Sequence, residues 1–336
     1  MLNLQQRINI LTHLQKYITG NDPVWMNIKV QAAENNPWFI SPFIDNAIQN
    51  IALQFLEPSK MNTWTASYDI PEQTSIPVNI GITMAGNIPL AGFHDFLCVF
   101  ISGHKQTIKL SSKDNVLLRH IAEKMKSWDP LIKDYIVFAD MLKGCEAYIA
   151  TGSNNTARYF EYYFRKYPHI IRKNRTSIAI LKGDETRKQL EELADDVYLY
   201  FGFGCRNVTK IYVPFDYDFL PLLESFKKYD DLIENHKYKH NYDFNLAMQM
   251  MNQKFYMTNG SLILSENPSV FSPISQLHYA FYNKPEEVYS TLNPEEIQCI
   301  TGTGKIPLGA AQSPGLSDYA DGIDTMKFLK HLPKNN

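Results

Sequence analysis

Short apolar runs alternate with longer amphipathic runs through the first half of the chain. The short runs are rich in β-branched residues, as expected of buried strands, and in the longer runs apolar residues recur every three or four positions, as expected of helices. Strands are predicted at 78–84, 107–110 and 147–150, and helices at 93–101, 116–125 and 157–167. This alternation is typical of β-α-β units, in which helices cover a parallel sheet.

Two helices are predicted ahead of this pattern. Apolar residues from Leu4 to Ile18 recur at helical spacing and Gly20 follows them. A second helix begins at Ser41 and ends at Pro58. Neither segment carries a group of residues that points to chemistry, so we interpret both as a helical layer ahead of the sheet.

The pattern restarts in the second half of the chain. Strands are predicted at 177–181, 209–213, 261–264, 276–281 and 296–300, and helices at 185–200, at 245–255 and from Pro285. A chain of 336 residues exceeds the size at which a single core usually stops growing, so two domains are expected. We place the boundary at residue 183, which gives ranges of 1–183 and 184–336.

Composition and charge exclude several classes of protein. Apolar residues make up 44% of the chain and charged residues 20%, which argues against intrinsic disorder. The net charge is −2 and no long basic run is present, so neither nucleic acid nor an anionic membrane is an expected partner. Prolines and glycines interrupt the charge-free stretch 73–94, which we interpret as strand, turn and buried helix rather than a membrane span. The acidic pair at 195–196 is expected on a solvated helix face.

The cysteines and histidines narrow the chemistry further. Cys98, Cys145 and Cys299 lie beside apolar residues and are interpreted as core. The four cysteines form no CxxC pair, which argues against a disulfide framework and a zinc site, and the N-terminus does not resemble a signal peptide, so a cytoplasmic protein is expected. HExxH and Gly-x-Ser-x-Gly are both absent, which disfavours metal-dependent and serine-dependent hydrolysis; no metal is expected.

Small and polar residues follow three of the predicted strands, in the turns 84–89, 109–113 and 151–155. The carboxyl ends of parallel strands form the edge at which nucleotides bind against helix N-termini. Each turn alone is more typical of a simple helix cap. Their succession on three β-α units favours nucleotide binding, although neither GxGxxG nor GxxxxGK[ST] is present.

Cys205 is a candidate nucleophile. It follows Gly202 and Gly204 between a predicted helix and a predicted strand. The glycines remove side-chain cover from the thiol, and the positive charge of Arg206 favours the thiolate. A lone cysteine is more often a small buried apolar residue, and that interpretation stays open here.

Taken in order, these segments resemble the aldehyde dehydrogenase superfamily, and more closely its fatty-acyl reductase branch, the LuxC-type acyl-CoA reductases, from about residue 78 to 329. The segment 202–205 and the strand after it resemble the nucleophile segment, and 78–89 resembles the strand and turn that end in an oxyanion-binding asparagine. Residues 108–112 resemble the segment whose lysine contacts the adenosine ribose, and residues 151–153 resemble the Gly-Ser turn under the pyrophosphate. Residues 269–273 resemble the motif near the nicotinamide ribose, and residues 307–315 resemble the closing glycine-rich motif.

The resemblance implies an α/β, aldehyde-dehydrogenase-like fold. Residues 1–183 would form N-terminal helices and a Rossmann-like nicotinamide cofactor domain, and 184–336 a second, catalytic α/β domain, with the active site in the cleft between them. Cys205 is implied as the nucleophile and Asn87 as an oxyanion donor. The implied cofactor-binding residues are Thr83, Met84, Lys109, Ser111, Ser112, Gly152, Ser153 and Phe271.

Departures from the family pattern point to reduction rather than oxidation. Aldehyde-oxidising members use a glutamate to activate water for deacylation, and the corresponding segment 171–175 has no carboxylate. Hydrolysis of a thioacyl enzyme is then expected to be slow, which favours hydride delivery to the thioester. Ser112, followed by Lys113, stands where NAD enzymes often have a glutamate, which favours NADPH with NADH as the alternative. Ser269 replaces a ribose-binding glutamate.

The implied function is NADPH-dependent reduction of a fatty acyl-CoA to the aldehyde through a thioacyl intermediate on Cys205. Three alternatives stay open: reduction of an acyl phosphate, reduction of an acyl group held by a carrier or partner protein, and a catalytically silent nucleotide-binding subunit. The sequence does not determine the acyl chain length, the donor or the oligomeric state. A homodimer is one option, with 62–70 as a strand exchanged between subunits.

Overall fold

The computed structural model describes residues 1–303 and 306–332. The chain forms two compact units, one of Met1–Asn174 together with the chain from Pro314 onwards, the other of Arg175–Ser313. These units divide the chain at different places from the predicted ranges of 1–183 and 184–336. The strand Thr176–Ile180 belongs to the second unit, and the C-terminal tail returns to the first. The functional labels attached to the two ranges stay predictions.

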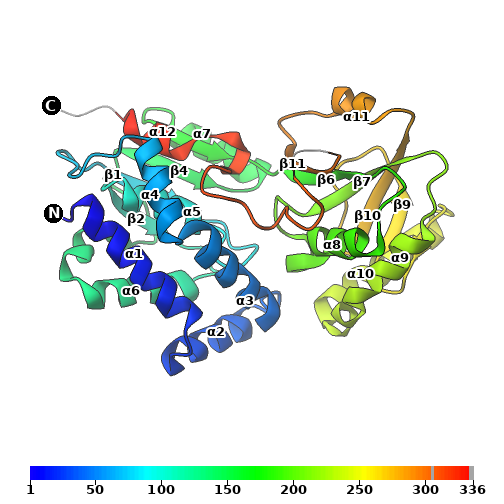
Figure 1. Cartoon of the computed structure of the whole chain (residues 1–336), viewed down its shortest axis with the longest axis horizontal. Helices are drawn as coiled ribbons and strands as arrows, with labels where there is room; N and C mark the ends of the chain where they lie inside the picture. The colour runs from blue at the N-terminus through cyan, green and yellow to red at the C-terminus, as the bar shows by residue number, and fades with distance from the viewer. Residues whose placement is uncertain (304–305, 333–336) are drawn as a thin grey trace. The chain divides into compact units, whose positions relative to one another are not determined.

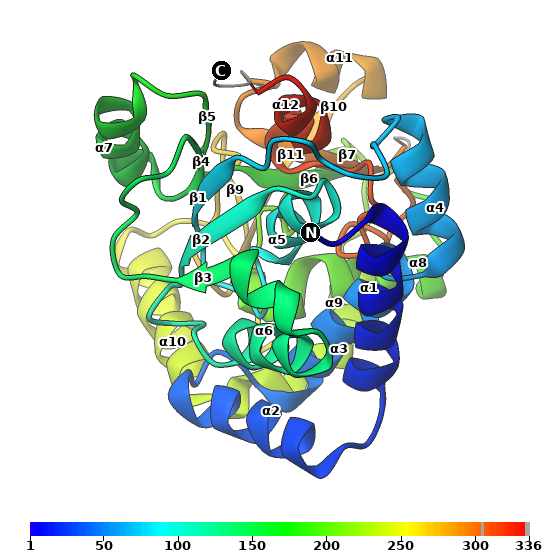
Figure 2. The same cartoon turned by 90° about the vertical axis from the view of Figure 1, so that its left-hand side faces the viewer.

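The first unit contains a five-stranded, fully parallel sheet in the order β3-β2-β1-β4-β5 (Figure 2). Its strands are β1 (Asn79–Thr83), β2 (Lys105–Lys109), β3 (Ile136–Phe138), β4 (Ala147–Thr151) and β5 (His169–Arg172). The three predicted strands correspond to β1, β2 and β4. Since the chain runs outward from β1 to β3 and then returns to β4 on the other side of β1, the topological switch point lies between β1 and β4.

Helices pack around this sheet and bury its faces. Their bounds are α1 (Leu4–Thr19), α2 (Pro23–Asn35), α3 (Ser41–Asn50), α4 (Pro58–Ser67), α5 (Phe93–Ile101), α6 (Leu117–Trp128), α7 (Asn154–Phe164) and α12 (Thr325–Lys330), with short helical turns at Ile51–Phe55, Pro130–Asp134 and Ala320–Gly322. Helix α5 is buried along its whole length and contacts α1, α12 and both β1 and β2. The predicted exchanged strand at 62–70 is wrong, because Pro58 begins helix α4 there.

A buried ion pair fixes the C-terminal tail to the first unit. Arg172, the last residue of β5, donates from Nη1 to Asp95 of α5 and from Nη2 to the Thr325 hydroxyl of α12 at 2.8 Å. Both charged side chains are almost fully buried. The Arg172 guanidinium therefore links β5, α5 and the C-terminal tail.

The second unit contains a six-stranded sheet in the order β11-β6-β7-β10-β9-β8, parallel except for β8. Its strands are β6 (Thr176–Ile180), β7 (Val208–Pro214), β8 (Met257–Thr258), β9 (Ile263–Glu266), β10 (Gln276–Tyr282) and β11 (Ile297–Gly302), and its helices α8 (Arg187–Tyr198), α9 (Leu220–Phe226), α10 (His236–Met251) and α11 (Pro285–Thr291), with short turns at Leu199–Gly202 and Lys227–Glu234. Figure 1 labels five of the strands, β6, β7, β9, β10 and β11. The predicted α/β class with two sheets is confirmed. Across the described residues, no helix is both long and apolar enough to cross a membrane.

Removing the cation of the buried pair should destabilise the first unit strongly. Arg172→Met leaves the Asp95 carboxylate buried without its partner, which typically costs about 3–5 kcal/mol of unfolding free energy. The double variant Asp95→Leu/Arg172→Met removes both charges and should recover most of this loss. Urea unfolding of the three proteins measures both differences, and equal stability of the single and double variants would contradict the account.

Candidate active site

Cys205 lies in a strained turn between helix α8 and strand β7. The chain leaves α8 through Tyr200, Phe201 and Gly202, which all have left-handed backbone conformations with φ of 56°, 54° and 78°. For the two non-glycine residues this conformation costs about 1–2 kcal/mol each, so the surrounding contacts must hold it. Such strain is found most often at functional sites.

Cys205 differs from the other three cysteines in exposure. Its side chain is partly exposed, whereas Cys98, Cys145 and Cys299 are buried, which confirms their interpretation as core. Burial raises the pKa of the Cys98 and Cys145 thiols. Neutral thiols react poorly with electrophiles, so Cys205 is the cysteine best placed to react.

Buried side chains hold the main chain on both sides of Cys205. Asn207 Oδ1 accepts the N–H of Gly204 at 2.8 Å, and the Asn207 N–H donates to the carbonyl of Gly204 at 3.0 Å. The Ser177 hydroxyl of β6 donates to the carbonyl of Cys205 at 3.0 Å. Nothing in the sequence pattern singled out Asn207 or Ser177, because Ser177 reaches Cys205 from β6 and no local pattern shows that Asn207 is buried.

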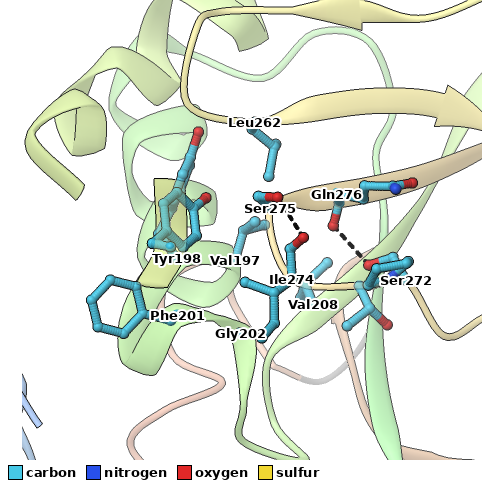
Figure 3. Close-up of a pocket in the computed structure, with 13 residues that line it drawn as sticks. Val197, Tyr198, Phe201, Gly202, Val208, Leu262, Ser272, Ile274, Ser275 and Gln276 are labelled. Carbon is cyan, nitrogen blue, oxygen red and sulfur yellow. Dashed lines mark hydrogen bonds between the residues drawn. The ribbon is translucent and has the colours of Figure 1, made fainter. Parts of the chain in front are cut away.

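A small cavity lies against this turn (Figure 3). Its volume of about 20 Å³ suits one water molecule rather than an acyl chain. Phe201 and Gly202 line it together with Ser272 and Pro273, and the Ser272 hydroxyl donates to the carbonyl of Gln276 at 2.7 Å. The structure thus brings the predicted nucleophile segment and the predicted 269–273 motif side by side.

The loop that carries Phe271 is held by side chains of β7 and β10. Thr209 and Lys210 of β7 donate to the carbonyls of Val270 and Pro268 at 2.6 and 2.8 Å, and His278 Nδ1 lies 3.0 Å from the carbonyl of Ser269. Burial lowers the pKa of Lys210 to about 8. These contacts fix the main chain of the loop.

The side chain of Ser269 does not extend away from this loop. Its hydroxyl donates to the carbonyl of Phe271 at 3.0 Å and lies 3.1 Å from the N–H of the same residue. The hydroxyl therefore serves the loop's own main chain, while Phe271 is half-buried beside it.

Asp196 corrects the expectation of a solvated acidic face. Its carboxylate is buried and accepts the N–H groups of Gly309 and Ala311 at 2.8 and 3.0 Å. Burial raises its pKa to about 7. The helical spacing could have predicted this burial, because Asp196 lies on the same helix face as Leu193, which is also buried. Asp195 is more exposed and pairs with Lys228.

In the first unit, the turns after β1 and β2 pack directly against each other. A Cβ on Gly86 would lie 2.5 Å from the Cβ and Oγ of Ser111, so only glycine fits there. The Met84 N–H donates to the carbonyl of Lys109 at 3.0 Å, and the Met84 side chain is buried. Met84 can therefore offer only its main chain to a ligand.

The predicted cofactor-binding residues other than Phe271, which lies in the second unit, fall at or just beyond the carboxyl ends of β1, β2 and β4. Thr83 and Lys109 are register partners at the carboxyl ends of β1 and β2. Ser112 follows on the exposed turn after β2, and Gly152 and Ser153 follow β4 across the switch point. Ser153 caps helix α7 by accepting the N–H of Thr156 at 3.3 Å. Whether a cofactor contacts them stays a prediction.

Asp114 holds the turn that carries Asn87. Its Oδ2 accepts the N–H of Leu90, which has a left-handed φ of 57°, at 2.7 Å. The carboxylate is buried, and its Oδ1 has no hydrogen-bond partner among the described residues. Burial raises the pKa of Asp114 to about 7. Asn87 itself is exposed.

Neither protein-family models nor curated proteins match this chain. Solved structures do match it in fold, at 11% sequence identity. Aldehyde dehydrogenase 21 from Physcomitrella patens, in complex with the reaction product succinate, aligns with 98% of this chain and 84% of its own length at a TM-score of 0.69. An aldehyde dehydrogenase from Bacillus cereus in complex with NAD+ aligns with 86% of this chain and 69% of its own length, at a TM-score of 0.61. An NADP-dependent enzyme from E. coli aligns with 87% of this chain and 71% of its own length, at a TM-score of 0.63. The predicted aldehyde-dehydrogenase-like fold is thereby confirmed.

We expect Cys205 to be alkylated at least tenfold faster than each of the other three cysteines at pH 8, because it alone of the four is not buried. The measurement is iodoacetamide labelling over time, followed by mass spectrometry of the four cysteine peptides. In urea the four rates should converge. Equal rates in the folded protein would remove Cys205 as a nucleophile candidate.

Asp114 should make the stability of the protein fall as pH rises. Since the folded-state pKa is raised to about 7, its contribution is present below about pH 4 and is lost as pH rises through about 7. Asp114→Asn keeps an acceptor for the Leu90 N–H but cannot ionise. The melting temperature of the variant relative to wild type should therefore increase by roughly 5 °C between pH 5 and pH 8. A difference that does not change with pH would show that Asp114 titrates normally.

Proposed function

We propose that this protein reduces an acyl thioester, with a fatty acyl-CoA as the favoured donor, to an aldehyde by means of a reduced nicotinamide cofactor. The observation that carries the proposal is Cys205, a partly exposed thiol on a turn whose main chain is held by buried side chains. Its unit has an aldehyde-dehydrogenase-like fold, and solved structures of that fold include complexes with NAD+.

The edge of the first sheet fits a nicotinamide dinucleotide. Open sheets of this kind bind dinucleotides at the switch point, here between β1 and β4, with the pyrophosphate at a helix N-terminus. Gly152 and Ser153 at the start of α7 would hold the pyrophosphate, and Lys109 the ribose. Ser112 and Lys113 are exposed and place no carboxylate near a 2′-phosphate, which favours NADPH. When bound, the cofactor supplies a hydride.

The reaction proceeds in two stages on Cys205. The thiolate attacks the carbonyl carbon of the thioester, the carbon–sulfur bond to coenzyme A breaks, and coenzyme A leaves as a thiolate. The acyl group is then held as a thioester of Cys205. A hydride supplied to its carbonyl carbon would break the bond to Sγ, release the aldehyde and regenerate the Cys205 thiolate. The Asn87 amide and the Cys205 N–H would donate to the oxyanion in both stages.

The surroundings of segment 171–175 support reduction over hydrolysis. The segment itself has no carboxylate, and Asp95 is buried in the ion pair with Arg172. Two other carboxylates that contact the segment are engaged by Lys173: Glu161 pairs with its ammonium at 3.0 Å, and Asp321 accepts its N–H at 3.2 Å. A carboxylate engaged in this way is poorly suited to take a proton from water. The acyl enzyme then persists until hydride or another thiol reaches it.

The proposal is tested by NADPH oxidation with long-chain acyl-CoA substrates. Wild-type protein should consume NADPH and release free coenzyme A and aldehyde in equal amounts, and should use NADH less well. Cys205→Ala should lose the activity, whereas Cys145→Ala, at a buried cysteine, should keep it. Cofactor binding without turnover of any acyl-CoA would reject this donor and leave acyl phosphates, carrier-bound acyl groups or a silent subunit.

Asn87→Ala should lower kcat by about 100- to 1,000-fold while KM for the acyl-CoA changes little, because the amide is proposed to bind the oxyanion rather than the ground state. Steady-state kinetics measure both constants. Asn115→Ala, at an exposed position after β2, serves as the control. A variant with unchanged kcat would exclude Asn87 from the chemical step.

A further inference from the structure

Asn207 is fully buried, and both ends of its carboxamide are engaged. Oδ1 accepts the N–H of Gly204 at 2.8 Å. Nδ2 lies within hydrogen-bond distance of three carbonyls at the end of α8, those of Leu199 at 2.8 Å, Asp196 at 3.1 Å and Val197 at 3.2 Å. Since Nδ2 has two hydrogens, these three carbonyls share them.

The Asn207 carboxamide supplies hydrogen bonds that a glycine turn usually supplies at the end of a helix. The last carbonyls of an α-helix lack intrahelical partners and are commonly satisfied by the N–H groups of a glycine turn. Here the chain leaves α8 through Tyr200 and Phe201, which hold left-handed conformations without being glycine. The side chain of Asn207 supplies donors to the helix end from beyond the turn.

The same carboxamide orients the turn that contains Cys205. Through Oδ1 it fixes Gly204, the residue before Cys205, and through Nδ2 it anchors that contact to α8. The Ser177 hydroxyl fixes the carbonyl of Cys205 from the neighbouring strand. The direction of the Cys205 N–H and of its Cα–Cβ bond is therefore set by two buried side chains.

We propose that Asn207 is a positioning residue of the reaction, which holds the Cys205 thiol and N–H in the orientation needed for attack on the acyl carbonyl. The proposal rests on the assignment of Cys205 as the nucleophile. Asn207 does not touch substrate; it acts through Gly204 and the end of α8. Its loss should therefore lower the rate of the chemical step rather than the affinity for substrate.

Asn207→Asp gives the sharpest test, because the two side chains have the same shape. Ionised aspartate still accepts the Gly204 N–H but donates nothing to the three carbonyls. Protonated aspartic acid regains one donor. At pH 8 we expect Cys205 alkylation and kcat to fall at least tenfold, with KM within threefold of wild type. Towards pH 6 the ratio of variant to wild-type alkylation should recover at least threefold.

Two further variants separate positioning from a general loss of stability. Tyr282→Phe removes a buried hydrogen bond to the carbonyl of Leu181 in the same unit, away from the Cys205 turn, and should leave Cys205 alkylation unchanged. Asn207→Ser introduces no charge and should lower alkylation at all pH values; it takes the place of Asn207→Asp if that variant does not fold.

Alkylation also keeps this proposal distinct from the proposed function. Iodoacetamide labelling reports on Cys205 without any turnover, so it tests Asn207 even if no acyl-CoA is reduced. The proposal is overturned if both Asn207 variants are less stable than wild type but label Cys205 within twofold of the wild-type rate, with the same pH profile. It is equally overturned if KM rises while kcat is unchanged.

Discussion

Side chains from the end of helix α8 and the start of strand β7 hold three loops of the second unit in place, among them the turn that contains Cys205. Three successive residues with left-handed conformations follow the helix. The buried carboxamide of Asn207 forms hydrogen bonds both with the end of the helix and with Gly204, the residue before Cys205. Asp196 of the same helix holds the segment around Gly309, and Lys210 of the strand holds the loop around Phe271. A helix and a strand thereby fix three separate loops.

The first unit uses buried polar groups in the same way. Asp114 accepts a main-chain N–H from the turn that carries Asn87, and the close approach of Gly86 to Ser111 joins that turn to the next one. In both units, side chains suited to chemistry that are at least partly exposed lie on loops whose main chain is bound by buried side chains. Such preorganisation matters because small displacements of a reacting group reduce rates strongly.

The strands and helices with strong periodicity could be predicted from the sequence. The missed strands, β3, β5 and β8, are two to four residues long and too short to show a period. Helix α2 is longer, but only Trp25 and Ala32 of its residues are buried, so no apolar face marks it in the sequence. Helix α10 begins at His236 rather than at 245, because its first turns are polar on most sides. The return of the tail to the first unit depends on the long-range contact of Arg172 with Thr325, which no local pattern reveals.

For the candidate site, the sequence identified exposed groups better than buried ones. Cys205 and the Gly152–Ser153 turn stand out because their neighbours are small, whereas Asn207 and Asp114 look ordinary until their partners are known. The charged neighbours of Asp196 in sequence favour a solvated position, although its phase with Leu193 favours a buried one, and its partners at 309 and 311 compensate its burial.

Acylation of Cys205 is tested most directly by mass spectrometry of protein incubated with a long-chain acyl-CoA in the absence of nicotinamide cofactor. The account predicts a mass increase of one acyl group on the peptide that contains Cys205, lost on treatment with neutral hydroxylamine, as expected of a thioester. The Cys205→Ala variant should show no adduct. An unmodified Cys205 peptide, or an acyl group attached at another residue, would contradict it.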